Sequence, residues 1–241
     1  MKINRPSYKS WVSDDEKLLF NVGGMVSILD ISGEKFVELK RFTKLKHPSY
    51  LALSSNKKLL ACSNTSGHIA VYDIETGETL IKSKYLSEEG RDLFFINNDT
   101  QIISPVRSGQ VFIFDIESGK TTVAFNFPLR TMNICPVSDS KFVAFGSNSG
   151  SKTYSRIFEF FLTGKATEKD LKIPYPYSLE SSCIVFSDEC ILFCGSNDSN
   201  NNKMKIIKFN LSKSETEWVF DTKTSIVSLG YFTCMCISKN K

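Results

Sequence analysis

The chain of 241 residues is 41% hydrophobic and 12% aromatic, which supports a folded core and excludes an intrinsically disordered protein. Its 30 basic and 26 acidic residues give a net charge of +4, too balanced to indicate a dedicated nucleic-acid or membrane-surface protein. No run of about 18 apolar residues occurs, and the N-terminal segment lacks the apolar core of a secretory leader. We therefore expect a cytoplasmic protein.

The first predicted unit spans residues 7–42 and contains four short strands separated by turn residues such as Asp14-Asp15 and Gly23-Gly24. The four strands are expected at Lys9–Ser13, Lys17–Val22, Met25–Ile31 and Lys35–Phe42. In the last of them apolar and charged residues share both faces, which is typical of an outer, half-exposed strand.

The second unit, residues 43–86, and the third, residues 87–127, carry the clearest motif in the chain. Gly67–Gly77 reads Gly-His-Ile-Ala-Val-Tyr-Asp-Ile-Glu-Thr-Gly, and Gly109–Gly119 reads Gly-Gln-Val-Phe-Ile-Phe-Asp-Ile-Glu-Ser-Gly. Each copy is an apolar strand that ends in a glycine turn. A looser copy, Met25–Gly33, belongs to the first unit.

The remaining units are less regular. The fourth, residues 128–173, has strands at Met132–Val137 and Lys141–Ser147, and the fifth spans residues 174–220. In the fifth unit Phe209-Asn210 stands where the clearer copies have an aromatic residue and Asp. A partial sixth unit, residues 221–241, is expected to begin with strands at Thr224–Tyr231 and Thr233–Ser238.

The repeats have a regular period. The turn glycines Gly33, Gly77, Gly119 and Gly164 are separated by 44, 42 and 45 residues. A period of about 40–45 residues with four strands in each unit is the signature of β-propeller blades. A blade is a small antiparallel sheet that must stack against its neighbours, so we predict a single all-β propeller domain over residues 1–241.

On these residues the chain resembles the WD40 repeat family. The resemblance rests on Ser63–Gly67, on the apolar strand that follows it, and on Tyr72-Asp73 and Phe114-Asp115 at the family's Trp-Asp position. The family's Gly-His motif is absent: His47 precedes a first strand and His68 follows a loop glycine, but neither completes the motif. The resemblance implies a non-enzymatic scaffold that presents a rigid surface to protein partners in the cytoplasm.

Five complete units and a partial sixth make a short propeller. At about 42 residues per blade, a seven-bladed ring needs about 294 residues. Three explanations stay open: a truncated chain, missing strands supplied by another chain, or a ring that remains open. An unpaired strand edge would allow self-association.

No catalytic, cofactor or metal motif emerges from the sequence. There are only two histidines, no phosphate-binding glycine loop and no hydrolase motif. The recurring Asp30, Asp73 and Asp115 are interpreted as turn-fixing residues because equivalent positions of successive blades lie far apart. The seven cysteines form no metal tetrad and are interpreted as reduced thiols in strands, mostly small core residues.

Basic residues cluster in the segment Lys35–Lys46. A nucleic-acid site would require a larger positive excess and interleaved aromatic residues, so a solvated outer strand is the preferred interpretation and nucleic acid is not expected as a partner.

Candidate binding residues lie on loops. Linkers between blades and loops between second and third strands are expected to share one rim of a propeller, where Arg and Tyr favour interface contacts. The segment Ile173–Ser178 contains two prolines that would stiffen two tyrosines for binding. The candidate partner-binding residues are His47, Arg91, Arg107, Arg130, Lys152, Tyr175 and Tyr177.

Two other functions compete with the scaffold. A lactonase-like propeller enzyme acting on a small sugar acid or ester would need acidic, His and Arg side chains around its axis, and the scarcity of His disfavours it. A fragment of a larger scaffold without independent activity is the third reading. A fold by itself does not determine the function.

Overall fold

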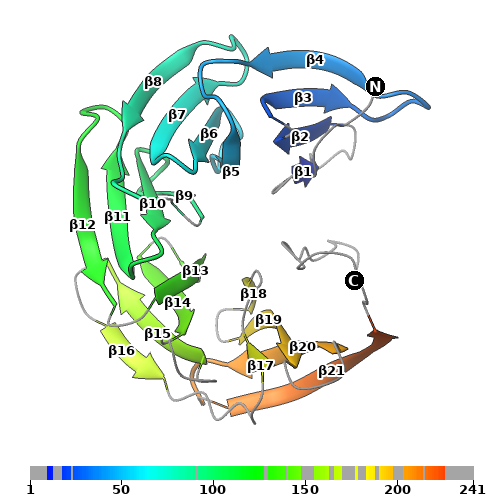
Figure 1. The fold of residues 1–241 in the computed structure, drawn as a ribbon, viewed down its shortest axis with the longest axis vertical. Coiled ribbons are helices and arrows are strands. Elements are labelled where there is room, and N and C mark those ends of the chain that lie inside the picture. The colour runs from blue at the N-terminus through cyan, green and yellow to red at the C-terminus, as the bar shows by residue number, and fades with distance from the viewer. Residues whose placement is uncertain are drawn as a thin grey trace. The chain divides into compact units, whose positions relative to one another are not determined.

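The computed structural model describes residues 10–12, 18–22, 24–88, 90, 92–127, 130–138, 140–147, 155–162, 166–169, 177–178, 183–187, 190–197, 203–213 and 215–225. Over these ranges the regular structure consists of strands β1–β21 and contains no helix (Figure 1). The strands form successive antiparallel sheets, which we call blades. The all-β prediction is therefore confirmed.

The first blade has the strand order β1-β2-β3-β4. Its strands are β1 (Ser10–Val12), β2 (Leu18–Val22), β3 (Val26–Asp30) and β4 (Val37–Phe42), close to the four predicted segments. Asp30 lies opposite Val37, and the register shifts between Ile28 and Leu29, where β4 contains a bulge at Leu39. A bulge of this kind bends and twists an edge strand.

The second and third blades repeat this order. The second blade contains β5 (Pro48–Leu53), β6 (Leu59–Asn64), β7 (His68–Asp73) and β8 (Thr79–Lys84). The third contains β9 (Phe94–Ile96), β10 (Gln101–Pro105), β11 (Gln110–Asp115) and β12 (Thr121–Asn126). The first three blades, apart from residues 108–110 and 124–126, belong to one compact unit.

The second compact unit holds the remaining sheets. The fourth blade contains β13 (Arg130–Pro136), β14 (Lys141–Ser147), β15 (Ser155–Phe161) and β16 (Ala166–Lys169). The fifth contains β17 (Tyr177–Ser178), β18 (Cys183–Ser187), β19 (Cys190–Asn197), β20 (Lys203–Asn210) and β21 (Glu215–Ser225). That all five blades form a single domain stays a prediction.

Two details of the fifth blade differ from the sequence prediction. Both β17 and β18 pair with β19, so the first strand of this blade is interrupted. Strand β21 continues past Phe220, where the fifth unit was predicted to end, and Ser225 still pairs with Lys203. Most of the predicted sixth unit lies outside the described residues.

The recurring aspartates fix the turns between third and fourth strands. The Asp73 carboxylate accepts hydrogen bonds from the Thr76 backbone N–H at 2.7 Å and from its hydroxyl at 3.0 Å. Asp115 accepts the equivalent pair from Ser118 at 2.9 and 2.7 Å. The Thr76 backbone N–H makes the largest contribution to lowering the pKa of Asp73, and the Ser118 hydroxyl does so for Asp115. The predicted structural role is confirmed.

The same device appears in less regular blades. Asp30 accepts from the backbone and the hydroxyl of Ser32 at 2.8 and 2.6 Å. In the fifth blade the side-chain oxygen of Asn210 accepts from the backbone N–H of Lys213 at 2.9 Å. An amide oxygen thus replaces the carboxylate, because the turn requires an acceptor and no charge.

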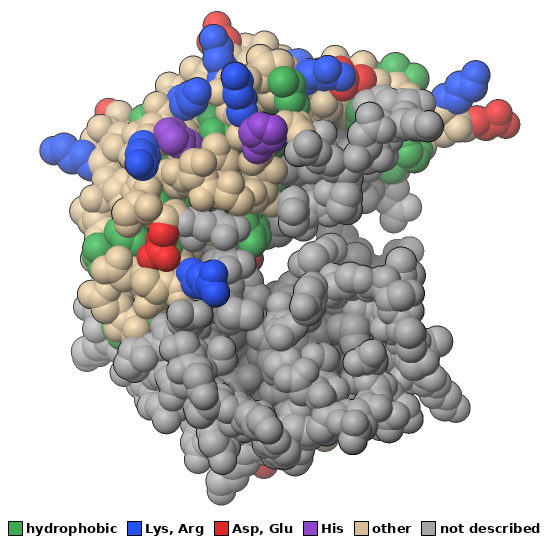
Figure 2. Space-filling view, in the orientation of Figure 1, with side chains coloured by type: hydrophobic (Ala, Val, Ile, Leu, Met, Phe, Trp, Pro, Cys, Tyr) green, Lys and Arg blue, Asp and Glu red, His purple; other side chains and the backbone are tan. Residues whose placement is uncertain are grey.

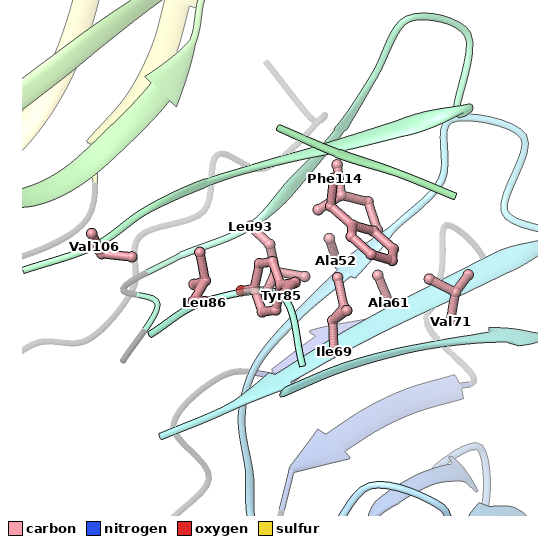
Figure 3. Close-up of a cluster of buried hydrophobic side chains, with 10 residues drawn as sticks. Ala52, Ala61, Ile69, Val71, Tyr85, Leu86, Leu93, Val106 and Phe114 are labelled. Atoms are coloured by element: carbon pink, nitrogen blue, oxygen red, sulfur yellow. The ribbon is translucent and has the colours of Figure 1, made fainter. Parts of the chain in front are cut away.

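Two hydrophobic clusters hold the first three blades together. Between the first and second blades, Phe42 packs against Tyr72 with ring centroids 4.8 Å apart. Between the second and third, Tyr85 packs edge-on against Phe114 at 5.9 Å (Figure 3). Each seam is therefore closed by an aromatic side chain from the end of one blade and one from the third strand of the next.

Cys62 belongs to the first of these clusters. It is completely buried as a free thiol, and burial raises the pKa of that thiol. The thiol is therefore unreactive, and Cys62 behaves as the predicted small core residue.

Candidate functional site

The linkers between blades lie beside the turns that join second and third strands. In the second blade the Gly67 carbonyl accepts hydrogen bonds from the backbone N–H groups of Tyr85 and Leu86 at 3.0 and 3.1 Å. In the third blade the Gly109 carbonyl accepts from Phe127 at 2.9 Å. We call this side of each blade the linker rim. These described blades confirm that linkers and second-to-third turns share a rim.

In the second, third and fourth blades the other two turns are joined in the same way on the opposite rim. The Ile74 N–H donates to the Lys58 carbonyl at 2.9 Å, which ties the third-to-fourth turn to the first-to-second turn. Ile116 and Leu162 repeat this bond in the third and fourth blades. We call this side the turn rim. Backbone hydrogen bonds therefore tie the loops of both rims to one another.

His47 lies on the linker rim, in the linker between β4 and β5, and its side chain is exposed. Its φ of 51° places it in the left-handed region, where a non-glycine residue needs support from its surroundings. Asn64 supplies that support. It donates to the Lys46 carbonyl at 3.1 Å and accepts from the His68 N–H at 3.0 Å, which fixes the linker against the β6–β7 turn.

Arg107 lies on the same kind of rim in the third blade, but in a second-to-third turn and not in a linker. It is exposed in the turn between β10 and β11. The adjacent Val106 forms a bridge with Gly90 of the linker that precedes β9. His47 and Arg107 therefore belong to the same kind of rim in the same compact unit.

The structure does not bring the other five candidates to this rim within the residues that it describes. The predicted loop position is wrong for Arg130 and Tyr177, because their backbones pair as strand residues in β13 and β17. Arg91, Lys152 and Tyr175 lie outside the described residues altogether. Their predicted binding role stays a prediction, as it does for His47 and Arg107.

A buried polar chain between the second and third blades was missed by the sequence analysis. The Tyr85 hydroxyl donates to Ser104 at 3.2 Å, and the Ser104 hydroxyl donates to the Asp92 carbonyl at 2.6 Å. A Cβ at Gly90 would lie only 2.8 Å from the Tyr85 oxygen, so Gly90 is needed for this close packing. The available sequence signal is the recurrence of an aromatic residue at the end of successive blades: Phe42, Tyr85 and Phe127 are separated by 43 and 42 residues.

The Tyr85 hydroxyl gives the protein a testable response to alkaline pH. Burial raises the pKa of Tyr85 to about 12, although its hydrogen bond to Ser104 opposes the shift. Above about pH 10 the unfolded state loses this proton before the folded state does, so Tyr85 lowers the stability as pH rises to about 12. At pH 7 the hydroxyl is protonated and its hydrogen bond to Ser104 is intact. Loss of that bond should make Tyr85→Phe less stable than wild type by about 1 kcal/mol at this pH.

Urea unfolding between pH 7 and pH 11.5 measures this response. The stability difference between wild type and Tyr85→Phe is expected to shrink above about pH 10 and to change sign as the folded-state pKa is approached. A difference that stays constant across this range would contradict the assignment. Taking the difference cancels the contributions of the other tyrosines.

Other kinds of site were sought in the part of the chain that the structure describes. Within it, no group of three or more His, Cys, Asp or Glu residues is arranged to hold a metal ion. The described residues also contain no helix long and apolar enough to cross a membrane. The surviving candidate is the linker rim of the first three blades.

Comparison with solved structures identifies the fold. Kuenenia stuttgartiensis hydrazine synthase matches 89% of this chain at a TM-score of 0.71 and 12% identity, over 65% of its own chain. U3-55K matches 88% at a TM-score of 0.69 and 13% identity, over 63% of its length. The RRP9 WD40 repeats match 88% at 0.68 and 13%, over 62%.

These matches confirm the predicted resemblance to WD40-type β-propellers, and at such identities they show the fold alone. The chain spans less than two thirds of the length of these three structures. No family model and no curated protein matches the sequence.

Proposed function

We propose that this protein is a non-enzymatic, cytoplasmic scaffold whose linker rim binds a protein partner. The observation that carries the proposal is the pair of exposed side chains His47 and Arg107 on loops that backbone hydrogen bonds hold rigid. A rigid loop loses little conformational entropy on binding, so exposed Arg and His on it are well placed to contribute affinity. The WD40-type fold supports this proposal only at the level of architecture.

The test is quantitative capture of binding proteins from a cytoplasmic extract, with wild type and a His47→Ala/Arg107→Ala double variant as baits. We expect a defined set of proteins on the wild type and at least about fivefold less of it on the variant. The matched control is Lys58→Ala/Lys120→Ala, which removes two exposed side chains from the turn rim and should leave capture unchanged.

Two results would oppose the proposal. Equal capture by wild type and by the His47→Ala/Arg107→Ala variant would show that these two side chains do not contribute to partner binding. Turnover of small lactones or esters by purified wild type, without stable capture of any protein, would favour the enzyme alternative. Light scattering on the same preparation tests self-association through an open blade edge, because a monomer of about 27 kDa would exclude it.

A further inference from the structure

The seam between the first and second blades is lined by lysines. On the second blade, Ala70 packs into the cluster shared with Val26 and Phe42 of the first blade, so this face of β7 turns toward the first blade. Lys82 lies directly opposite Ala70, and Lys84 lies opposite His68. Because cross-strand partners point to the same face of a sheet, both lysines lie on the face turned toward the first blade.

The first blade and the linker add more lysines to the same seam. Lys40 pairs with Ile28, a member of the shared cluster, and its amino group donates to the carbonyls of Ile74 and Glu75 at 2.8 and 2.5 Å. Lys44 and Lys46 follow in the linker that joins the two blades, and both are exposed. We call these residues the lysine seam: Lys40, Lys44, Lys46, Lys82 and Lys84. Figure 2 shows lysine or arginine side chains gathered with both histidines on one face.

Most of this charge is available to a partner. Lys44, Lys46, Lys82 and Lys84 are exposed and form no ion pair with any residue that the structure describes. The neighbouring Arg41 differs, because it forms an ion pair with Glu38 at 2.7 Å on the opposite face of β4. The lysine seam is therefore a local excess of positive charge.

Among the described residues, the seam between the second and third blades has an apolar side chain at the position that Lys40 occupies in the first seam. In the first seam, the Lys40 side chain lies 3.4 Å from the position that a Cβ on Gly77 would occupy. In the second seam, the Ile81 side chain lies 3.2 Å from the equivalent position on Gly119, so Ile81 takes the place of Lys40. The residue two positions further along β8 is Ser83, which pairs with the buried Ile69. The packing of the repeat thus accepts an apolar side chain at the position of Lys40, so it does not by itself require a lysine there.

We propose that the lysine seam docks an extended acidic segment of a protein partner, an inference that deepens and rests on the proposed scaffold function. Exposed aliphatic side chains on the same outer strands, Leu39 at 56% and Leu80 at 50%, fit a segment in which apolar residues alternate with Asp or Glu. Nucleic acid fits less well, because single strands bind by stacking on aromatic side chains. Phe36, the exposed aromatic among the described residues, precedes β4, at the end of that strand remote from the linker.

The probe is a fluorescein-labelled peptide of about twelve residues that alternates Glu with Leu and Val, long enough to span the seam. Fluorescence anisotropy measures its binding to the whole chain. We expect binding that weakens with added salt and a loss of about tenfold or more in affinity for Lys82→Glu/Lys84→Glu. The matched control, Lys58→Glu/Lys120→Glu, makes the same change in net charge on the turn rim and should stay within about twofold of wild type.

Three outcomes would overturn the inference. Equal loss in both double variants would mean that net charge alone is sensed. Equal binding of the peptide with Gln in place of Glu would remove the charge argument. Tighter binding of single-stranded oligouridylate than of the peptide would assign the seam to RNA. If the peptide fails while extract proteins still depend on His47 and Arg107, the seam inference falls and the scaffold proposal stands.

Discussion

Gly67→Ala is expected to lower the free energy of unfolding by about 3 kcal/mol. Gly67 has a φ of 75°, a conformation that costs a residue with a Cβ about 1–2 kcal/mol. In addition, the new Cβ would collide with the Leu86 carbonyl oxygen and lie 3.1 Å from that of Glu88. These backbone atoms belong to the linker that Gly67 itself binds, so relief of the collision would break the bonds that close the linker rim.

The matched control separates the two effects. Gly24 stands at the equivalent place in the first blade with a φ of 89°, and a Cβ there would meet no atom within 4 Å. Gly24→Ala therefore keeps the conformational strain without the collision and should cost about 1 kcal/mol. Urea unfolding followed by circular dichroism measures both variants. Equal losses would show that the collision is absorbed by a small shift of the linker.

The fold was predictable because its signals are local and repeated. The turn sequence from Asp73 to Gly77 recurs from Asp115 to Gly119, and each copy supplies the acceptor and the glycine that the turn needs. The strands around these turns appeared close to their predicted positions. The signal weakens in the fifth blade, where no local rule predicts that the first strand is interrupted or that β21 runs to Ser225.

The candidate site was less predictable because it depends on which face of a strand meets which neighbour. The rim position of His47 and Arg107 followed from the connectivity of the strands alone. The lysine seam did not, because Lys82 and Lys84 acquire meaning only through the register that pairs them with Ala70 and His68. The sequence pattern of Lys35–Lys46 by itself indicates a solvated strand, because Lys82 and Lys84, which complete the lysine seam, lie about 40 residues further along the chain.

Phe114→Ala is expected to lower the free energy of unfolding by about 3–5 kcal/mol. Phe114 is fully buried and contacts the second blade through Tyr85, within the cluster that also holds Ala52, Ala61 and Ile69 (Figure 3). The surrounding side chains belong to hydrogen-bonded strands of two blades, which limits how far they move to fill the cavity. Phe114→Leu, which leaves a smaller cavity, should cost about 1–2 kcal/mol.

Phe36→Ala is the matched control because it makes the same chemical change at a side chain that is 51% exposed. It should change stability by no more than about 0.5 kcal/mol. Urea unfolding monitored by both circular dichroism and tryptophan fluorescence tests whether the transition remains two-state. Similar losses for Phe114→Ala and Phe36→Ala would contradict the aromatic closure of the seam, because only burial distinguishes the two substitutions.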